Sequence, residues 1–144
     1  MNRGATIAIT CAALAVLAIT PASGATIDRA AYIRANTKIL NGLPRPHRSR
    51  IVAQQSIPQY SGFDPPGSVT GYLTQRSYRL LPGSIRRNNV LGFYRERLPE
   101  TWHLRTAGRN ALVYRRGRAM LVIHRGRPGS RFDFLLVVDH KAYR

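Results

Sequence analysis

The pattern of apolar and polar residues is most regular in the second half of the chain. Residues 72–80 alternate with a period of two and are rich in Tyr and Thr, which predicts a β-strand. Pro82-Gly83 then turns the chain, and Ser84 is expected to cap a helix that runs to Leu98 and is stopped by Pro99. The apolar positions with helical spacing are Ile85, Val90, Phe93, Tyr94 and Leu98.

Four short strands are predicted after this helix, over residues 102–105, 111–115, 118–125 and 131–139. The connecting segments are short and contain Gly, Pro or Asn, so neighbouring strands should pair as antiparallel hairpins. In the last strand, one of the two faces should belong to the core. That face carries Phe132, Phe134, Leu136 and Val138.

The first half of the chain predicts a helix and a weaker strand. Asp28 can cap a helix that Asn41-Gly42 ends. Its apolar residues Ala31, Ala35 and Ile39 recur every four positions, with Ile33 and Leu40 seven apart beside them. The proline-containing stretch 43–47 cannot continue a helix. A short strand is expected over 51–57, and residues 59–68 have the composition of a loop or linker.

The order of strand, helix and four-strand meander predicts an α+β fold with a single antiparallel β-sheet and a helix packed across it, preceded by an N-terminal helix. Cystatin-like proteins share this order, but an analogy at the level of fold carries no function. We expect residues 25–68 to hold the N-terminal helix and a Pro/Gly-rich linker, and residues 69–144 to form the α+β domain.

The first 24 residues are typical of a signal peptide. Arg3 gives a positive start, residues 7–19 are uncharged and mostly apolar, and Ala22-Ser23-Gly24 places small residues at a cleavage site. The alternative is a retained membrane anchor, which needs about 20 apolar residues. The sequence therefore predicts export and cleavage, with a secreted or cell-envelope location and no transmembrane domain after cleavage.

The net charge of the chain after cleavage indicates which kind of partner to expect. The chain has 23 Lys and Arg against 6 Asp and Glu, a net charge of +17. Removing the leader removes Arg3 and the one cysteine, so the charge becomes 22 − 6 = +16 and disulfides, thiol catalysis and cysteine-ligated metals are excluded. Such a charge favours anionic partners and makes their binding salt-dependent. The partner is expected to be an anionic envelope polymer or lipid surface, or extracellular nucleic acid.

A solvated surface with no dedicated ligand is the alternative reading of this charge. Of the basic residues, 21 are Arg, which a GC-rich genome also favours. The sequence does not determine the oligomeric state.

A search for catalytic chemistry gives little. The four histidines, His47, His103, His124 and His140, have no close metal-ligand spacing, and no metal or cofactor is predicted. Glu96 and Glu100 would share a helical face only if the helix did not end at Pro99. The chain is therefore predicted not to be an enzyme.

Two alternatives from other classes stay open. The first is a secreted hydrolase or metal-dependent enzyme that uses His103, His124 and the carboxylates, since these two histidines lie in strands on either side of a hairpin. The second is a protein-binding or inhibitory module that uses the loops at one edge of the sheet.

Arginines at the ends and turns of the meander are the candidate anion-binding residues, because guanidinium groups pair bidentately with phosphates and carboxylates. Tyr72, Tyr78 and Trp102 are candidate stacking surfaces, although Trp102 is expected to pack in the core. The candidates are Arg115, Arg116 and Arg118 at one edge, and Arg105, Arg109, Arg125, Arg127 and Arg131 at the other.

A set of short motifs spans most of the exported chain. They are Tyr32, Asn36, Leu40 and Leu43-Pro44-Arg45-Pro46; Gly71-Tyr72 with Tyr78-Arg79; Pro82-Gly83-Ser84; Val90 with Phe93-Tyr94-Arg95; Leu98-Pro99 with Trp102; and Val138-Asp139-His140. In these motifs the chain resembles uncharacterised small exported proteins of actinobacteria and related bacteria. The resemblance implies an extracytoplasmic α+β domain and supplies no catalytic residues.

Overall fold

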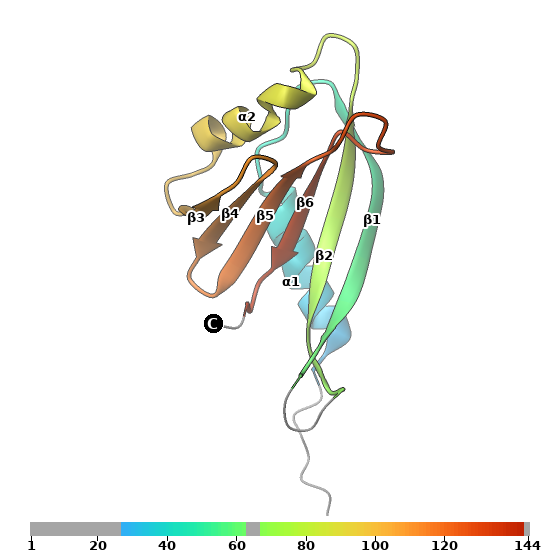
Figure 1. The fold of residues 1–144 in the computed structure, drawn as a ribbon. Coiled ribbons are helices and arrows are strands. Elements are labelled where there is room, and N and C mark those ends of the chain that lie inside the picture. The colour runs from blue at the N-terminus through green and yellow to red at the C-terminus, as the bar shows by residue number, and fades with distance from the viewer. Residues whose placement is uncertain (1–26, 63–66, 143–144) are drawn as a thin grey trace, which may run out of the picture.

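The computed structural model describes residues 27–62 and 67–142, and the predicted signal peptide lies outside these ranges. Six antiparallel strands form one open sheet in the order β1-β2-β6-β5-β4-β3, with both helices on one of its faces (Figure 1). The predicted α+β class, single antiparallel sheet and strand order are confirmed. The elements are α1 (Arg29–Asn41), β1 (Ser49–Tyr60), β2 (Val69–Leu80), the 3-10 turn η1 (Arg87–Asn89), α2 (Val90–Arg97), β3 (His103–Ala107), β4 (Ala111–Arg116), β5 (Ala119–Arg125) and β6 (Phe134–Asp139).

The meander β3 to β6 forms by successive antiparallel hairpins, as predicted. Its last strand pairs with β2 over Thr74 to Tyr78, which joins the two halves of the sheet. The strand predicted over 131–139 begins only at Phe134, because the preceding residues fold over the end of β2. There the Asp133 amide donates to the Tyr78 carbonyl at 2.8 Å, and the Leu80 amide donates to the Asp133 carboxylate at 2.7 Å.

Strand β1 is longer than the predicted strand over 51–57 and runs along the whole of β2. The loop expected over 59–68 is shorter at its start, since Gln59 and Tyr60 belong to the strand. The boundary expected at residue 68 therefore falls inside the β1–β2 hairpin. Strand β1 is also an edge of the sheet, and its exposed large apolar residues are Ile51, Val52, Ile57 and Tyr60.

The core lies between the sheet and the two helices. Val90 and Tyr94 of α2 and Leu40 of α1 are buried together with Trp102. The alternating pattern of the last strand is confirmed, because Phe134, Leu136 and Val138 are buried while Leu135 and Val137 are half-buried on the other face. The sheet residues in this cluster are Tyr78, Leu112, Tyr114, Ala119, Leu121, Ile123, Phe134, Leu136 and Val138.

Helix α1 is capped as predicted but buries a different face. The Asp28 side chain accepts a hydrogen bond from the Ala31 amide at 3.0 Å. The buried residues are Tyr32, Asn36 and Leu40, one position on from the expected stripe. Of the expected apolar positions Leu40 is buried, whereas Ala31 is exposed and Ala35 and Ile39 are only half-buried. The other two buried residues were not expected because they are polar and form specific hydrogen bonds.

These hydrogen bonds tie α1 to β2 and to the end of β6. The Tyr32 hydroxyl donates to Asp139 Oδ1 at 2.5 Å, and Asn36 Nδ2 donates to the Tyr72 carbonyl at 2.8 Å. The His140 amide donates to Asn36 Oδ1 at 2.8 Å. The closest approach is at Gly71, where an added Cβ would come within 2.6 Å of the Tyr32 hydroxyl oxygen. Buried polar groups of this kind are tolerated because they are hydrogen-bonded.

Helix α2 begins later than predicted. Ser84 is not its cap, because the Ser84 hydroxyl donates to the His47 carbonyl, and the chain passes through η1 before α2 starts at Val90. Ile85 and Phe93 are half-buried at the margin of the core rather than inside it. Among residues 27–62 and 67–142, neither helix has the length and apolar run needed to cross a membrane.

Candidate anion-binding surface

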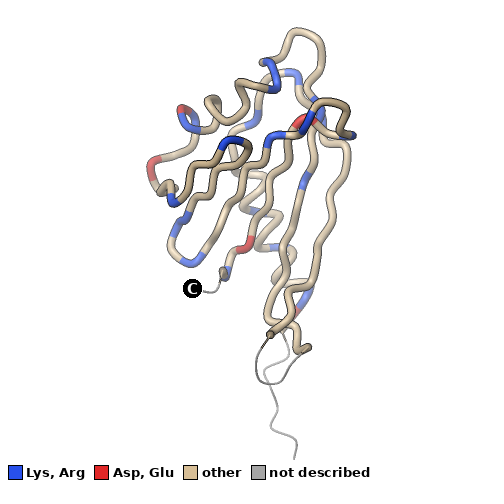
Figure 2. The backbone as a smooth tube through the Cα atoms, in the orientation of Figure 1, with Lys and Arg blue, Asp and Glu red and all other residues tan. Residues whose placement is uncertain are grey.

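Most carboxylates in the described residues serve the fold itself. Of five such residues, Asp28 caps α1, Asp133 accepts from the Leu80 amide, and Asp139 accepts from Tyr32 and, at 2.9 Å, from the Lys141 amide. The other two, Glu96 and Glu100, are exposed at the far end of α2. The carboxylates of these three aspartates are thus held by backbone amides and by Tyr32. Basic residues occur along most of the described chain (Figure 2).

One end of the sheet gathers arginines from two connections of the meander. The β3–β4 turn is bonded to the end of β5, from which the β5–β6 loop continues: the Arg125 amide donates to the Asn110 carbonyl and Arg125 Nη2 donates to Asn110 Oδ1, both at 2.8 Å. Within the loop, the Arg127 amide donates to Ser130 Oγ at 3.1 Å. Arg109, Arg127 and Arg131 are exposed at this end. The expected grouping of these residues with Arg125 is what the structure shows.

Strands β1 and β2 add two more arginines that the sequence did not indicate. Arg50 and Arg79 are direct cross-strand partners, so their side chains share one face, and both are exposed. Like charges placed directly opposite each other on a sheet are destabilising. The β5–β6 loop crosses the end of β2 beside this pair (Figure 1). We call Arg50, Arg79, Arg109, Arg125, Arg127 and Arg131 the loop-end cluster.

Arg105 lies apart from this cluster. It sits within β3 at a register shift between Leu104 and Thr106, on the outer edge strand of the sheet, and not in the turn that follows. Its side chain is exposed. Arg105 was expected beside Arg109 because the strand predicted over residues 102–105 would have placed it next to the turn.

At the opposite end of the sheet, the β4–β5 turn carries the other predicted group. Arg116 lies over the ring of Trp102, 4.3 Å from its centroid, and lines a cavity of about 200 Å³ together with Lys38. Arg115 is the cross-strand partner of Met120 and points to the other face, and Arg118 is exposed in the turn. These three arginines share an end of the sheet but not a surface.

The predicted stacking residues are mostly taken up by packing. Trp102 is 5% exposed and Tyr78 is 2% exposed, so both belong to the core. Tyr72 is half-buried, with its ring 5.9 Å from that of Tyr32 and the guanidinium of Arg29 at the same distance from its centroid. The structure therefore leaves only part of Tyr72 for stacking on a ligand.

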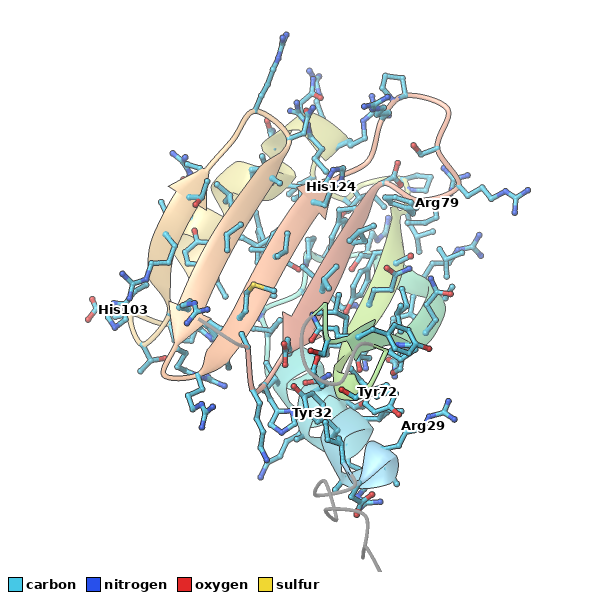
Figure 3. The ribbon with its side chains drawn as sticks, turned by 60° about the horizontal axis from the view of Figure 1, so that its bottom comes forward. Arg29, Tyr32, Tyr72, Arg79, His103 and His124 are labelled. Carbon is cyan, nitrogen blue, oxygen red and sulfur yellow. The ribbon has the colours of Figure 1, made fainter. Side chains whose placement is uncertain are left out.

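The two histidines of the enzyme hypothesis are not brought together. His103 pairs with Arg115 at one end of the sheet, whereas His124 pairs with Ala111 at the other (Figure 3). Along the strands, these positions are four residues apart, roughly 13 Å. No group of three or more His, Cys, Asp or Glu residues able to hold a metal ion occurs in the described part of the chain.

His140 lies within the hydrogen-bonded contacts of α1. Its ring is 4.1 Å from that of Tyr32, centroid to centroid, and its Nδ1 is 3.1 Å from Asn36 Oδ1. Burial lowers the pKa of His140, the charge of Lys141 lowers it further, and Asp139 opposes the change. The lowered pKa favours the neutral form of the ring in this position.

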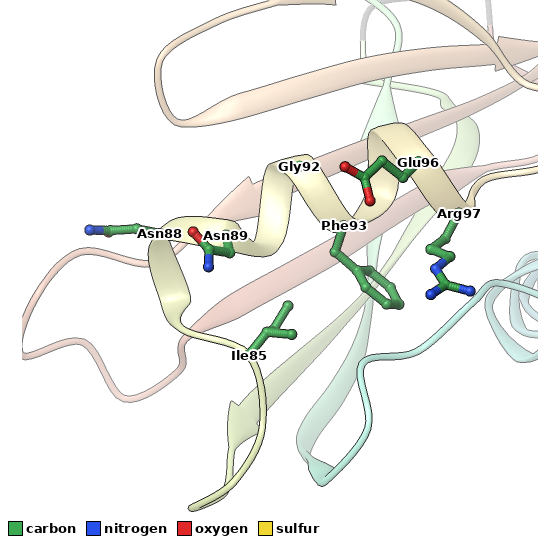
Figure 4. A pocket seen from close by; sticks show the side chains of 7 residues that line it. All are labelled: Ile85, Asn88, Asn89, Gly92, Phe93, Glu96 and Arg97. Carbon is green, nitrogen blue, oxygen red and sulfur yellow. The ribbon is translucent and has the colours of Figure 1, made fainter.

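A groove along α2 was not predicted from the sequence. It has a volume of about 480 Å³ and is lined by Ile85, Asn88, Asn89, Gly92, Phe93, Glu96 and Arg97 (Figure 4). The one sequence signal that could have indicated it is a glycine in the middle of a predicted helix.

Comparison with known proteins identifies no relative of this chain. No family model, no curated protein and no solved structure matches it.

Proposed function

We propose that this chain is an exported, non-catalytic domain of the cell envelope that binds an anionic polymer or surface through the loop-end cluster. One observation carries the proposal: the exposed cross-strand pair Arg50 and Arg79 lies at the same end of the sheet as the exposed arginines Arg109, Arg127 and Arg131. The signal-peptide pattern and the charge of +16 after cleavage support it.

The chemistry of the cluster fits repeated anionic groups. Two guanidinium groups opposed across β1 and β2 repel each other in the free protein, and a phosphate or carboxylate placed between them replaces repulsion with two attractive, charge-assisted contacts. Asp133, the acidic residue at this end, has one carboxylate oxygen engaged by the Leu80 amide, which limits its use as a counter-ion. Binding should be long-ranged in approach and strongly weakened by salt.

A second candidate function, strand addition by a partner protein, is favoured by strand β1. This edge strand exposes Ile51, Val52, Ile57 and Tyr60, and extended peptides commonly add to such an edge through backbone hydrogen bonds. It predicts binding that is insensitive to salt, which distinguishes it from the first proposal.

The test measures retention of the purified protein on three anionic probes as salt is raised: phosphate-rich wall polymer, vesicles containing anionic lipid, and duplex DNA. The variant carries Arg79→Gln, Arg127→Gln and Arg131→Gln. Its matched control carries Arg29→Gln, Arg34→Gln and Arg95→Gln, which removes the same charge from exposed positions on the two helices.

We expect tight binding to at least one probe at low salt. A plot of the logarithm of the binding constant against the logarithm of the salt concentration should become less steep by about one unit of slope for each contacting arginine that is removed. The control should keep nearly all of the slope. Equal losses in the two variants would show that only net charge matters, and retention that ignores salt, or no retention at low salt, would overturn the proposal.

A further inference from the structure

The groove along α2 combines an apolar floor with polar walls. Ile85 and Phe93 are half-buried at the margin of the core, and Asn88, Asn89, Glu96 and Arg97 are exposed around them (Figure 4). The ring of Phe93 is held edge-to-face against buried Tyr94, with centroids 5.1 Å apart. Its volume of about 480 Å³ lies in the range of small-molecule sites.

Gly92 is the residue that packing does not explain. It is the third residue of α2, in the first turn, and glycine is unfavourable within a helix because it loses the most conformational freedom on folding. A Cβ added at Gly92 would meet nothing within 4 Å, whereas at Gly71 or Gly126 it would collide with neighbouring atoms. No neighbour therefore requires a glycine here, and its effect is to leave the groove open along the helix.

The polar side chains of the groove indicate which kind of ligand it can bind. The two carboxamides both donate and accept hydrogen bonds, the carboxylate of Glu96 only accepts, and the guanidinium of Arg97 only donates. A hydroxyl group also donates and accepts, so a ligand rich in hydroxyls can satisfy every one of them. A simple anion would be repelled by Glu96, and a purely apolar ligand would leave the walls unpaired.

We infer that this groove binds a sugar ring, with the ring's apolar face on Phe93 and its hydroxyls on Asn89, Glu96 and Arg97. The inference goes beyond the loop-end cluster and does not depend on it.

The test uses isotope-labelled protein titrated with maltotriose, chitotriose and trigalacturonate at millimolar concentration, followed by NMR. At least one trisaccharide should shift the Gly92 amide and the Phe93 ring signals. Gly92→Leu should fill the groove and weaken that binding by at least about tenfold. Gly92→Ala is the matched control and should weaken it far less, because one methyl group occupies little of the groove.

Asn89→Ala is a second variant that leaves the helix intact, since the Asn89 side chain makes no capping hydrogen bond. It should also weaken binding. The inference is overturned if none of the three sugars shifts these signals, or if Gly92→Leu binds as well as the parent. Shifts confined to the loop-end cluster, seen with trigalacturonate alone, would support the proposed function and overturn the sugar site.

Discussion

The Tyr32 hydroxyl donates a hydrogen bond of 2.5 Å to the carboxylate of Asp139, which is 1% exposed. The bond connects the first turn of α1 to the last residue of β6 across 107 positions of the chain. It gives a buried carboxylate a partner and at the same time closes the N-terminal helix onto the end of the sheet. Tyr32 belongs to the first of the short motifs named in the sequence analysis, and Asp139 belongs to the last.

Tyr32→Phe should therefore destabilise the protein. Removing the hydroxyl leaves a buried carboxylate with fewer donors, a loss of about 1–3 kcal/mol in the free energy of unfolding. Urea denaturation measures it. Tyr60→Phe, at an exposed tyrosine of β1, is the control and should leave the midpoint unchanged. Equal stability of Tyr32→Phe and the parent would show that the contact contributes nothing.

Tyr94→Phe should have the opposite effect. The Tyr94 hydroxyl is buried and has no hydrogen-bond partner among the described residues, and burial raises the pKa of this phenol strongly. Removing an unsatisfied buried hydroxyl should raise the free energy of unfolding by about 1 kcal/mol. The same denaturation experiment tests this, and a clear loss of stability would mean that the hydroxyl has a partner in solution.

His140 makes stability depend on pH. Because burial and Lys141 lower its folded pKa, the unfolded chain, with a histidine pKa of about 6.5, binds the proton more tightly than the folded state does. The stability that comes from keeping His140 neutral is fully present above pH 6.5. It is lost as the pH falls from 6.5 through the pKa of His140 in the folded state.

The thermal midpoint should thus drop on acidification through this window, and less so in His140→Gln. His47→Gln, at an exposed histidine, should retain the full drop. An identical pH dependence in the parent and in His140→Gln would assign the effect to other groups.

Arg79→Gln should stabilise the free protein while weakening its binding to polyanions. It removes a like charge directly opposite Arg50, a relief of about 0.2–1 kcal/mol at low salt that screening diminishes. Thermal unfolding at low and high salt gives the stability, and the retention assay gives the binding. A variant that loses both would place Arg79 in a structural role.

Gly92→Ala should raise stability by up to about 0.5–1 kcal/mol, because alanine loses less conformational freedom within a helix and its methyl group meets open space. Chemical denaturation of the parent and the variant provides the measurement. A destabilised variant would mean that the position is more crowded than the groove implies.

The fold was predictable where local pattern and burial agree. The period of two in β2 and β6 and the turns of the meander follow directly from side-chain alternation and turn chemistry. The face of α1 was not predictable, because Asn36 is buried and looks like a surface residue until its partners in β2 and at His140 are known. The role of Ser84 was not predictable for the same reason, because its hydroxyl donates a hydrogen bond to the carbonyl of His47, 37 residues earlier in the chain.

The candidate surface was partly predictable for a related reason. Arg109, Arg125 and Arg127 lie in or beside the turns of alternate hairpins of the meander, β3–β4 and β5–β6, so sequence order alone places them at one end of the sheet. Arg50 and Arg79 come from a pairing between β1 and β2 that no local signal specifies. Arg115 and Arg116 are neighbours in sequence, yet the alternation of the strand sends them to opposite faces.

Strand β1 ties the protein's solubility to ionic strength. It is an outer strand of twelve residues with exposed apolar side chains, and Arg50 is its one charged residue. Edge strands are commonly guarded against pairing with other chains by charges of their own. Besides Arg50 and Pro58, the protection expected here is the mutual repulsion of molecules with a net charge of +17, which weakens as salt shortens the Debye length. If the loop-end cluster binds a polyanion as proposed, neutralisation removes the same repulsion, and molecules gathered on one polymer should then associate edge to edge.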